Sequence, residues 1–272
     1  MTDPLEAVQK FYAQGFEETR LESDDNKLER ARTFELLERF LPAAPATVHD
    51  IGGGPGVYAL WLAARGYKVN LLDLTPLHVE QVLAAAENAG VKLESTTVGD
   101  ARALPYPDSS SDAVLLLGPL YHLTERSDRL KALEEAYRTL KPGGVLCAVS
   151  INRFSGSFDG LFLERYADPD YRSLSDRSLH DGQHRNPEGK SYFTTAFFHH
   201  PLELKAEVEA AGFEVEALVG IEGPGWLLRD FDAYWFESAK REWVLHLARA
   251  LESEPTLLGV SAHVMAVGRK PV

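Results

Sequence analysis

The sequence predicts an α/β protein with a doubly wound, mostly parallel sheet and helices on both of its faces. Three observations lead to this fold class. From residue 47 onward, short apolar runs alternate with segments of helical periodicity, which is the order of elements that builds a parallel sheet. A glycine-rich turn, GGGPG at residues 52–56, directly follows the first apolar run. The chain has 272 residues, of which 44% are hydrophobic, and this is ample for a packed core.

The first half of the sheet is expected to consist of two strand–helix units. Strands are predicted at residues 46–51 and 68–72, and helices at residues 57–65 and 77–89. In the second unit, Thr75 and Pro76 have the residue types of a helix N-cap and a first helical position, and Gly90 that of a left-handed helix terminator.

The second half of the sheet is expected to contain five more strands, which brings the total to seven. They are predicted at residues 93–98, 113–117, 145–149, 213–219 and 258–267. The run 113–117 is apolar throughout, as is typical of a strand buried on both faces. Helices are expected at 127–140, where the turn Lys141-Pro142-Gly143-Gly144 stops the helix, at 202–211 and over 226–251. The last two strands should form a hairpin-like pair.

The chain divides into four segments around this one sheet. Residues 1–45 carry two amphipathic helical stretches and should pack over the ligand cleft, and residues 46–151 form the ligand-binding core. Residues 152–200 interrupt the α/β alternation without a clean period of either kind, yet they are rich in aromatic side chains. We therefore interpret them as a lid over the substrate and not as a disordered loop. Residues 201–272 return to the same α/β domain.

Charge and composition narrow the partners that we expect. The net charge of −13 disfavours nucleic acid, because phosphate backbones repel an acidic surface. The single cysteine, Cys147, lies in an apolar run, so a cytoplasmic location and a role in core packing are expected. The N-terminus lacks the features of a secretory signal, and no apolar run approaches the length that spans a bilayer, so no membrane partner is expected.

The glycine turn and Asp73 form the first part of the candidate binding site. Gly52, Gly53, Gly54 and Gly56 would let backbone approach a ligand closely, although a tight strand–helix turn would also explain them. Asp73 ends the second strand, at the sheet edge where ligands bind, and could accept both hydroxyls of a ribose; capping the next helix is an equal alternative.

Two further acids complete the candidate site. Asp100 has the matching position after the third strand and could accept a hydrogen bond from an exocyclic amino group, or could be a plain turn residue. The glycines also fit the dinucleotide pattern G-x-G-x-x-A, so an NAD(P)-dependent oxidoreductase is an alternative. Asp50, at the end of the first strand, favours a positively charged ligand portion over a pyrophosphate.

These residues together resemble the motifs of class I S-adenosylmethionine-dependent methyltransferases, in the small-molecule branch that includes the ubiquinone and menaquinone biosynthesis enzymes. The resemblance covers about residues 48–151 and continues through Ser111-Asp112-Ala113-Val114 and Leu140-Lys141-Pro142-Gly143-Gly144. It implies a Rossmann-like fold and S-adenosylmethionine as the cofactor. By position it assigns cofactor binding to Asp50, Gly52, Gly53, Gly54, Gly56, Asp73, Leu74, Gly99, Asp100, Ala101, Leu117 and Gly118.

The reaction so implied is methyl transfer to an oxygen, nitrogen or carbon atom of a small molecule. Since the methyl group is already activated, a base is optional, and Tyr121 and His122 are the nearest candidates; packing beneath the lid is an equal interpretation. Lid aromatics weakly favour an apolar or aromatic acceptor. No metal is expected, because the spacing of His180 and His184 does not fall on a predicted helix. A binding or regulatory protein that retains the cofactor without turnover stays open as a further alternative.

Overall fold

The computed structural model describes residues 4–15, 17–23, 26–186, 190 and 192–272, and it contains the predicted seven-stranded sheet. The strand order is β3-β2-β1-β4-β5-β9-β8. The strands are β1 (Thr47–Ile51), β2 (Lys68–Asp73), β3 (Ser95–Val98), β4 (Ser111–Leu116), β5 (Leu140–Ile151), β8 (Glu214–Gly220) and β9 (His263–Arg269). The first five are parallel, and β9 is antiparallel to both β5 and β8. The chain order reverses between β1 and β4, so ligands are expected at the carboxyl ends of these two strands.

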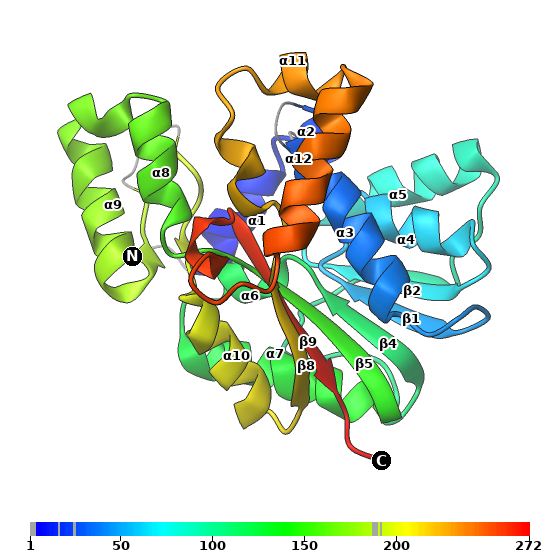
Figure 1. The fold of residues 1–272 in the computed structure, drawn as a ribbon. Coiled ribbons are helices and arrows are strands. Elements are labelled where there is room, and N and C mark those ends of the chain that lie inside the picture. Colours follow the sequence, from blue (N-terminus) through cyan, green and yellow to red (C-terminus); the bar gives the residue numbers. More distant parts are fainter. Residues whose placement is uncertain (1–3, 16, 24–25, 187–189, 191) are drawn as a thin grey trace.

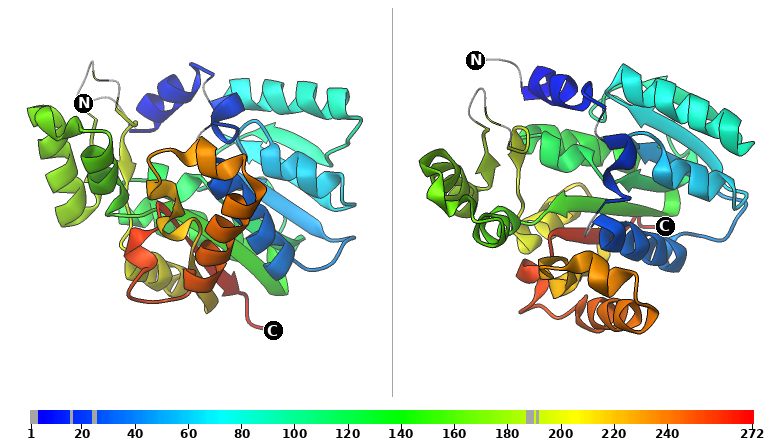
Figure 2. Two further views of the ribbon diagram at one scale, coloured as in Figure 1. Left: turned by 45° about the horizontal axis from the view of Figure 1, so that its top comes forward. Right: turned by 90° about the horizontal axis from the view of Figure 1, so that it is seen from above.

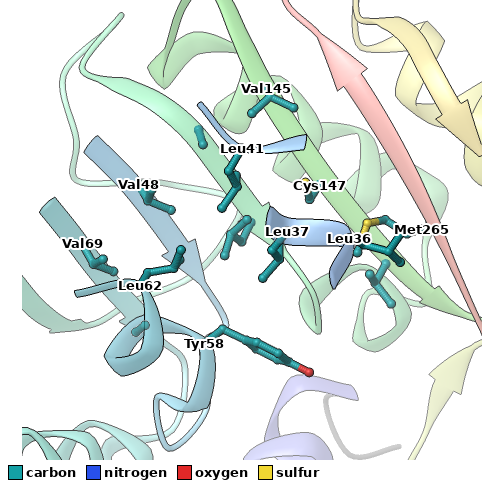
Figure 3. Packing of buried hydrophobic residues seen from close by; sticks show 14 of the residues in the cluster. Leu36, Leu37, Leu41, Val48, Tyr58, Leu62, Val69, Val145, Cys147 and Met265 are labelled. Carbon is teal, nitrogen blue, oxygen red and sulfur yellow. The ribbon is translucent and has the colours of Figure 1, made fainter. Parts of the chain in front are cut away.

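Each face of the sheet is buried under its own helices. Along β5, Val145, Cys147 and Val149 pack with α3 (Asn26–Phe40) and α4 (Val57–Ala63), whereas Leu146 and Ala148 pack with α7 (Arg126–Thr139) and α10 (Pro201–Ala210). This alternation follows from the two-residue period of a strand. Figure 3 shows the first face, where Leu36 and Leu37 of α3 lie over the side chains of the central strands. Cys147 is buried in this cluster.

The elements of the core occur close to their predicted positions, with three differences. Helix α5 (Pro76–Ala89) ends at Gly90, which has the predicted left-handed conformation with φ 64°. The segment Lys141–Gly144 falls within β5, but it bulges: pairing with β4 shifts register and resumes at Val145. The long helical region predicted over 226–251 is three elements, η2 (Gly223–Leu227), α11 (Phe231–Trp235) and α12 (Ser238–Leu251). The last strand begins only at His263, after the 3₁₀ turn η3 (Leu258–Val260).

The segment 152–200 is more regular than its sequence predicts. It contains α8 (Ser155–Phe162), η1 (Arg165–Ala167), α9 (Pro169–Asp181) and the short antiparallel strands β6 (Gln183–His184) and β7 (Ala196–Phe197). Asp168 caps α9 through its side chain, Pro169 is the first helical residue, and Gly182 ends the helix with φ 80°. These start and stop signals were present in the sequence, but the apolar period between them is weak. Figure 1 shows α8 and α9 as a helical pair to the side of the sheet.

The N-terminal segment forms α1 (Pro4–Tyr12), the short α2 (Glu17–Arg20) and α3. Figure 2 shows α1 between α5 on one side and the α8–α9 pair on the other. Phe16, which belongs to the first amphipathic stretch of the sequence, lies outside the described residues. Helix α6 (Pro119–His122) follows β4 and contacts α1. Among the described residues, no helix is long and apolar enough to cross a membrane.

Candidate functional site

The glycine turn between β1 and α4 takes a backbone path that side chains would obstruct. Gly52 and Gly54 have φ 69° and 56°, in the left-handed region that favours glycine. A Cβ atom on Gly52 would lie 2.6 Å from Pro119 Cγ, and one on Gly53 would lie 2.8 Å from Asp50 Oδ2. The turn therefore brings bare backbone next to the Asp50 carboxylate and the start of α6.

Gly56 has a different role from the other three predicted glycines. It adjoins the start of α4 with φ 89°, and a Cβ atom there would lie only 2.0 Å from Val82 Cγ2 of α5. Gly56 is absent from the lining of the hollows described below. Its observed contact is helix packing, which the sequence pattern could not separate from ligand contact.

Asp73 is the last residue of β2, and its side chain stabilises the glycine turn. Its Oδ2 accepts a hydrogen bond from the backbone N–H of Gly54 at 2.8 Å, and its Oδ1 accepts one from the N–H of Thr75 at 2.8 Å. The Nδ1 atom of His78 lies 3.0 Å from the same Oδ1. A carboxylate has about four lone-pair sites, so these three contacts leave about one for a ligand. No local sequence pattern indicates that His78 contacts Asp73.

A hollow opens on this turn. We name it the nucleoside hollow. The predicted cofactor residues on its wall are Gly52, Gly54, Asp73, Leu74, Gly99, Asp100, Ala101 and Gly118. At the rim, the Asp100 carboxylate is held by Arg102, with Nη2 at 2.6 Å from Oδ2, and this pairing keeps the pKa of Asp100 low against the effect of its burial.

A second hollow lies behind the glycine turn and has Asp50 on its wall, together with Gly53 and Leu117. The Asp50 side chain is buried, and neither carboxylate oxygen has a hydrogen-bond partner among the described residues. Burial, and next the charge of Asp73, raise the pKa of Asp50 to about 7, against a smaller lowering by the nearby backbone N–H of Ala59. An unpaired buried carboxylate is costly, so this wall is suited to a cationic group.

A third hollow continues from the first two, and we name it the acceptor hollow. Its wall consists of Phe11, Tyr12, Glu17, Arg20, Tyr121, Ile151, Phe193 and His263. Tyr121 and Glu17 line all three hollows, so the three hollows adjoin one another, and we refer to them together as the cleft. Aromatic side chains dominate the acceptor hollow, while Arg20 and His263 supply basic groups at its wall.

Tyr121 and His122, the two predicted base candidates, both line the nucleoside hollow. The Nε2 atom of His122 lies 2.9 Å from the hydroxyl of Tyr12. Burial lowers the pKa of His122 to about 3 and raises that of Tyr121 well above its ordinary value. A base with so low a pKa accepts protons poorly at neutral pH, and Tyr121 stays protonated there. These values weaken both residues as general bases.

Four other histidines lie in the segment 152–200. His200 caps α10 and directly precedes Pro201. His199 is fully buried between Ser150 and Glu207, and Arg129 binds the same Glu207 with Nη2 at 2.8 Å from Oε1. His180 and His184 do not share a helix, because α9 ends at Asp181.

Residues outside the predicted set also line the cleft: Tyr12, Glu17, Arg20, His78 and His263. They come from helix or strand ends that are far apart in the sequence. A feature that could have indicated Glu17 and Arg20 is their position in a short charged segment between two amphipathic stretches.

This fold and site define a class I methyltransferase, with the ligand cleft at the carboxyl edge of a Rossmann-like sheet. A family model described as a methyltransferase domain matches residues 49–148. The demethylmenaquinone methyltransferase of Thermus thermophilus is 32% identical over 190 residues, which cover 68% of this chain and 81% of that protein. The chain therefore belongs to the class I S-adenosylmethionine-dependent methyltransferase family.

Two further similarities have different coverage. A ubiquinone/menaquinone biosynthesis C-methyltransferase of Caulobacter vibrioides is 29% identical over 126 residues, so the match spans about half of that relative, 49%, and 43% of this chain. A solved structure of a methyltransferase from Methanosarcina mazei has a TM-score of 0.59 at 20% identity and covers 87% of this chain and 97% of that one. The latter similarity shows the fold.

Proposed function

We propose that this chain binds S-adenosylmethionine across the nucleoside hollow and the Asp50 wall, and transfers its methyl group to a small molecule in the acceptor hollow. Family membership supports the cofactor. The observation that carries the proposal is the buried Asp50 carboxyl beside the glycine turn, because a buried carboxylate without a hydrogen-bond partner is stabilised when a cationic ligand group binds it. The amino group of the cofactor's methionine portion is such a cation.

The remaining predicted residues support the same orientation. Asp73 keeps a free lone pair for a ribose hydroxyl, and Leu74, Gly99, Asp100 and Ala101 supply the adjoining wall for the adenine. The cofactor would then extend from the end of β3, past β2, to the end of β1. Tyr121 and Glu17 would border the methyl group, because they line all three hollows.

The bound cofactor would supply a methyl group on a positively charged sulfur, which needs no further activation. The protein's contribution would be to hold the acceptor in line with that methyl group and to exclude water. The aromatic wall of the acceptor hollow and the cover given by α1 suit this task. His122 and Tyr121 would position the acceptor and the cofactor, and the lowered pKa of His122 argues against its use as a base.

Binding of S-adenosylhomocysteine, measured by calorimetry at pH 8, tests this proposal. Wild-type protein should bind it, and Asp50→Asn and Asp73→Asn should lose most of the affinity. Asp176→Asn is the matched control, because Asp176 is exposed on α9, away from the cleft residues. NADH should not compete, since Asp50 would repel a pyrophosphate.

The folded wild-type protein failing to bind S-adenosylhomocysteine would contradict the proposal. Binding with no release of S-adenosylhomocysteine from S-adenosylmethionine, across a panel of phenols, amines and acidic carbon compounds, would instead favour a protein that retains the cofactor without turnover.

A further inference from the structure

His263 is the first residue of β9, and its side chain reaches the acceptor hollow at the edge of the sheet. It pairs in register with Ile151, which lines the same hollow at the end of β5. The ring Nδ1 donates to Oε1 of Glu222 at 2.6 Å. Nε2 makes no hydrogen bond within the described part of the chain and is not among its fully buried, unpartnered atoms. The ring, which lines the hollow, therefore has one nitrogen available to a bound molecule.

Glu222 is fixed behind His263 by three contacts. Besides the imidazole, it accepts hydrogen bonds from the hydroxyl of Ser261 at 2.7 Å and from the backbone N–H of His263 at 3.0 Å. Glu222 is 1% exposed, so it cannot itself meet a ligand. The pair of Glu222 and His263 resembles functional histidines whose ring orientation and tautomer are set by a buried carboxylate.

The second basic group of the hollow, Arg20, has few donors to spare. Its guanidinium binds Glu17 through Nε at 2.8 Å, Asn26 through Nη1 at 3.1 Å, and Glu29 through Nη1 at 2.6 Å and Nη2 at 3.1 Å. A guanidinium has five N–H donors, and these contacts use four of them. His263 is therefore the basic group best placed to meet a ligand.

We propose that His263 is the acceptor-binding cation of this protein. Its Nε2–H donates to an anionic oxygen on a planar acceptor held between the aromatic side chains, and Glu222 is the positioning residue that fixes the ring. The inference rests on the function proposed above and adds the charge of the acceptor, which would bind as a phenolate, an enolate or a carboxylate.

The charges around His263 support its protonated state. Burial disfavours a charged ring, but Glu29 and Glu222 outweigh this effect, with Arg20 opposing them, and the pKa of His263 rises to about 9. The imidazole is then protonated at neutral pH and cannot act as the base. The positive sulfur of a bound cofactor would add to the attraction of His263 for an anionic acceptor.

Glu29, Glu222 and His263 each place one polar atom within 4.8 Å of the others, a spacing that would also suit a divalent cation. Two observations favour an ion-pair cluster over a metal site. Glu29 is already bound by two nitrogens of Arg20, and Glu222 by the His263 ring. A metal would have to displace both.

The test uses 4-nitrophenol, with 4-nitroanisole as a probe of similar shape that cannot ionise, and protein saturated with S-adenosylhomocysteine. At pH 8 the wild type should bind the phenolate about tenfold more tightly than the anisole, the size expected of one hydrogen bond to a charged group. His263→Gln should remove this preference, and His263→Lys should restore part of it. The matched control is His246→Gln, because His246 is exposed on α12 and stacks on Trp243.

Glu222→Gln provides a readout that a purely structural role would not move. The wild-type preference for the phenolate should persist to about pH 9, where His263 loses its proton. In Glu222→Gln it should disappear at a lower pH, because the ring loses one of its two stabilising charges. If His263→Gln is too unstable to purify, this pH profile carries the test.

Three results would overturn the inference. The first is that wild type binds neither probe, or binds both equally well. The second is that His263→Gln keeps the preference for the phenolate, and the third is that the preference requires added Mg²⁺ or Zn²⁺ and disappears with EDTA. The last would make the cluster a metal site. Binding of benzoate in place of 4-nitrophenol would retain the cation and indicate a carboxylate acceptor. Affinity for S-adenosylhomocysteine is measured on every variant, so a failure of this inference is distinguishable from a failure of the cofactor proposal.

Discussion

Replacing Asp50 with asparagine should stabilise the ligand-free protein while it removes cofactor binding. Asp50 is 1% exposed and has no hydrogen-bond partner for either oxygen within the described residues. In its ionised form it is therefore a buried, unpaired charge, and asparagine has nearly the same shape without that charge. The substitution should relieve a cost that the folded chain carries until a cation is bound.

The size and sign of the effect follow from the pKa of Asp50, which rises from 3.8 to about 7 in the folded protein. One pKa unit is worth 1.36 kcal/mol, so the full difference of about three units corresponds to about 4 kcal/mol, as an upper value. A raised carboxyl pKa makes the folded state hold its proton longer than the unfolded state does. The cost is therefore absent below about pH 4, grows as the pH rises, and is complete above about pH 7.

Urea denaturation of wild type and Asp50→Asn at pH 5 and pH 8, without ligand, measures this difference. Asparagine should raise the free energy of unfolding at pH 8, and its advantage should be about 2 to 3 kcal/mol smaller at pH 5. A variant that is less stable than wild type at pH 8 would refute the reasoning, because it would mean that the carboxylate is paired in the folded state.

The same titration should govern cofactor affinity. If a cation binds only the ionised carboxylate, the competent fraction of wild type increases about tenfold from pH 6 to pH 8, and the affinity for S-adenosylhomocysteine should follow it. Any binding left in Asp50→Asn should lack this component of the pH dependence.

Two further predictions concern packing away from the cleft. Glu207→Gln should cost about 3 to 5 kcal/mol in urea denaturation, because it leaves the Arg129 guanidinium buried without its counter-ion. Burial would raise the pKa of Glu207, but His199 and Arg129 lower it to about 2; wild-type stability from this group is therefore present above about pH 4.5 and lost as the pH falls toward 2. A loss under about 1 kcal/mol would show that the pair is not desolvated. Gly56→Ala should lower the melting temperature, because the new Cβ atom would lie 2.0 Å from Val82. Adding Val82→Ala should recover part of that loss. If the effects of the two substitutions are simply additive, the contact between these residues is contradicted.

The sheet could be predicted from sequence because its information is local. An apolar run such as residues 113–117, or a terminator such as Gly90, indicates its own structure through burial or backbone conformation. The acids predicted to bind the cofactor could be placed at the sheet edge for the same reason, since each lies at or just after the end of a strand. Gly56 shows where such local prediction stops. The sequence indicates that a glycine is required at this position, but it does not indicate whether the group packed against that glycine is Val82 or a ligand.

The acceptor side of the cleft could not be predicted in this way. Arg20, Glu29, Glu222 and His263 come from a short helix, a second helix, a loop and a strand end that are widely separated in the chain. None lies in a recognisable local pattern, and their charges become informative only when the fold brings them together. The helix α9 was missed for a related reason: its cap and terminator are clear, but its apolar stripe is too weak for periodicity to reveal it.

Charge distribution along the cleft connects the two proposals. At one end, Asp50 and Asp73 form a wall of carboxylates, and their mutual repulsion contributes to the raised pKa of Asp50. At the other end, Glu29 and Glu222 lie close to His263 and keep it protonated. A cofactor with a cationic amino group and sulfur satisfies the first end, and an anionic acceptor satisfies the second. Because the positive sulfur would lie between the two ends, each ligand should bind more tightly when the other is present. The affinity for 4-nitrophenolate should therefore be lower with S-adenosylhomocysteine, whose sulfur is uncharged, than with S-adenosylmethionine.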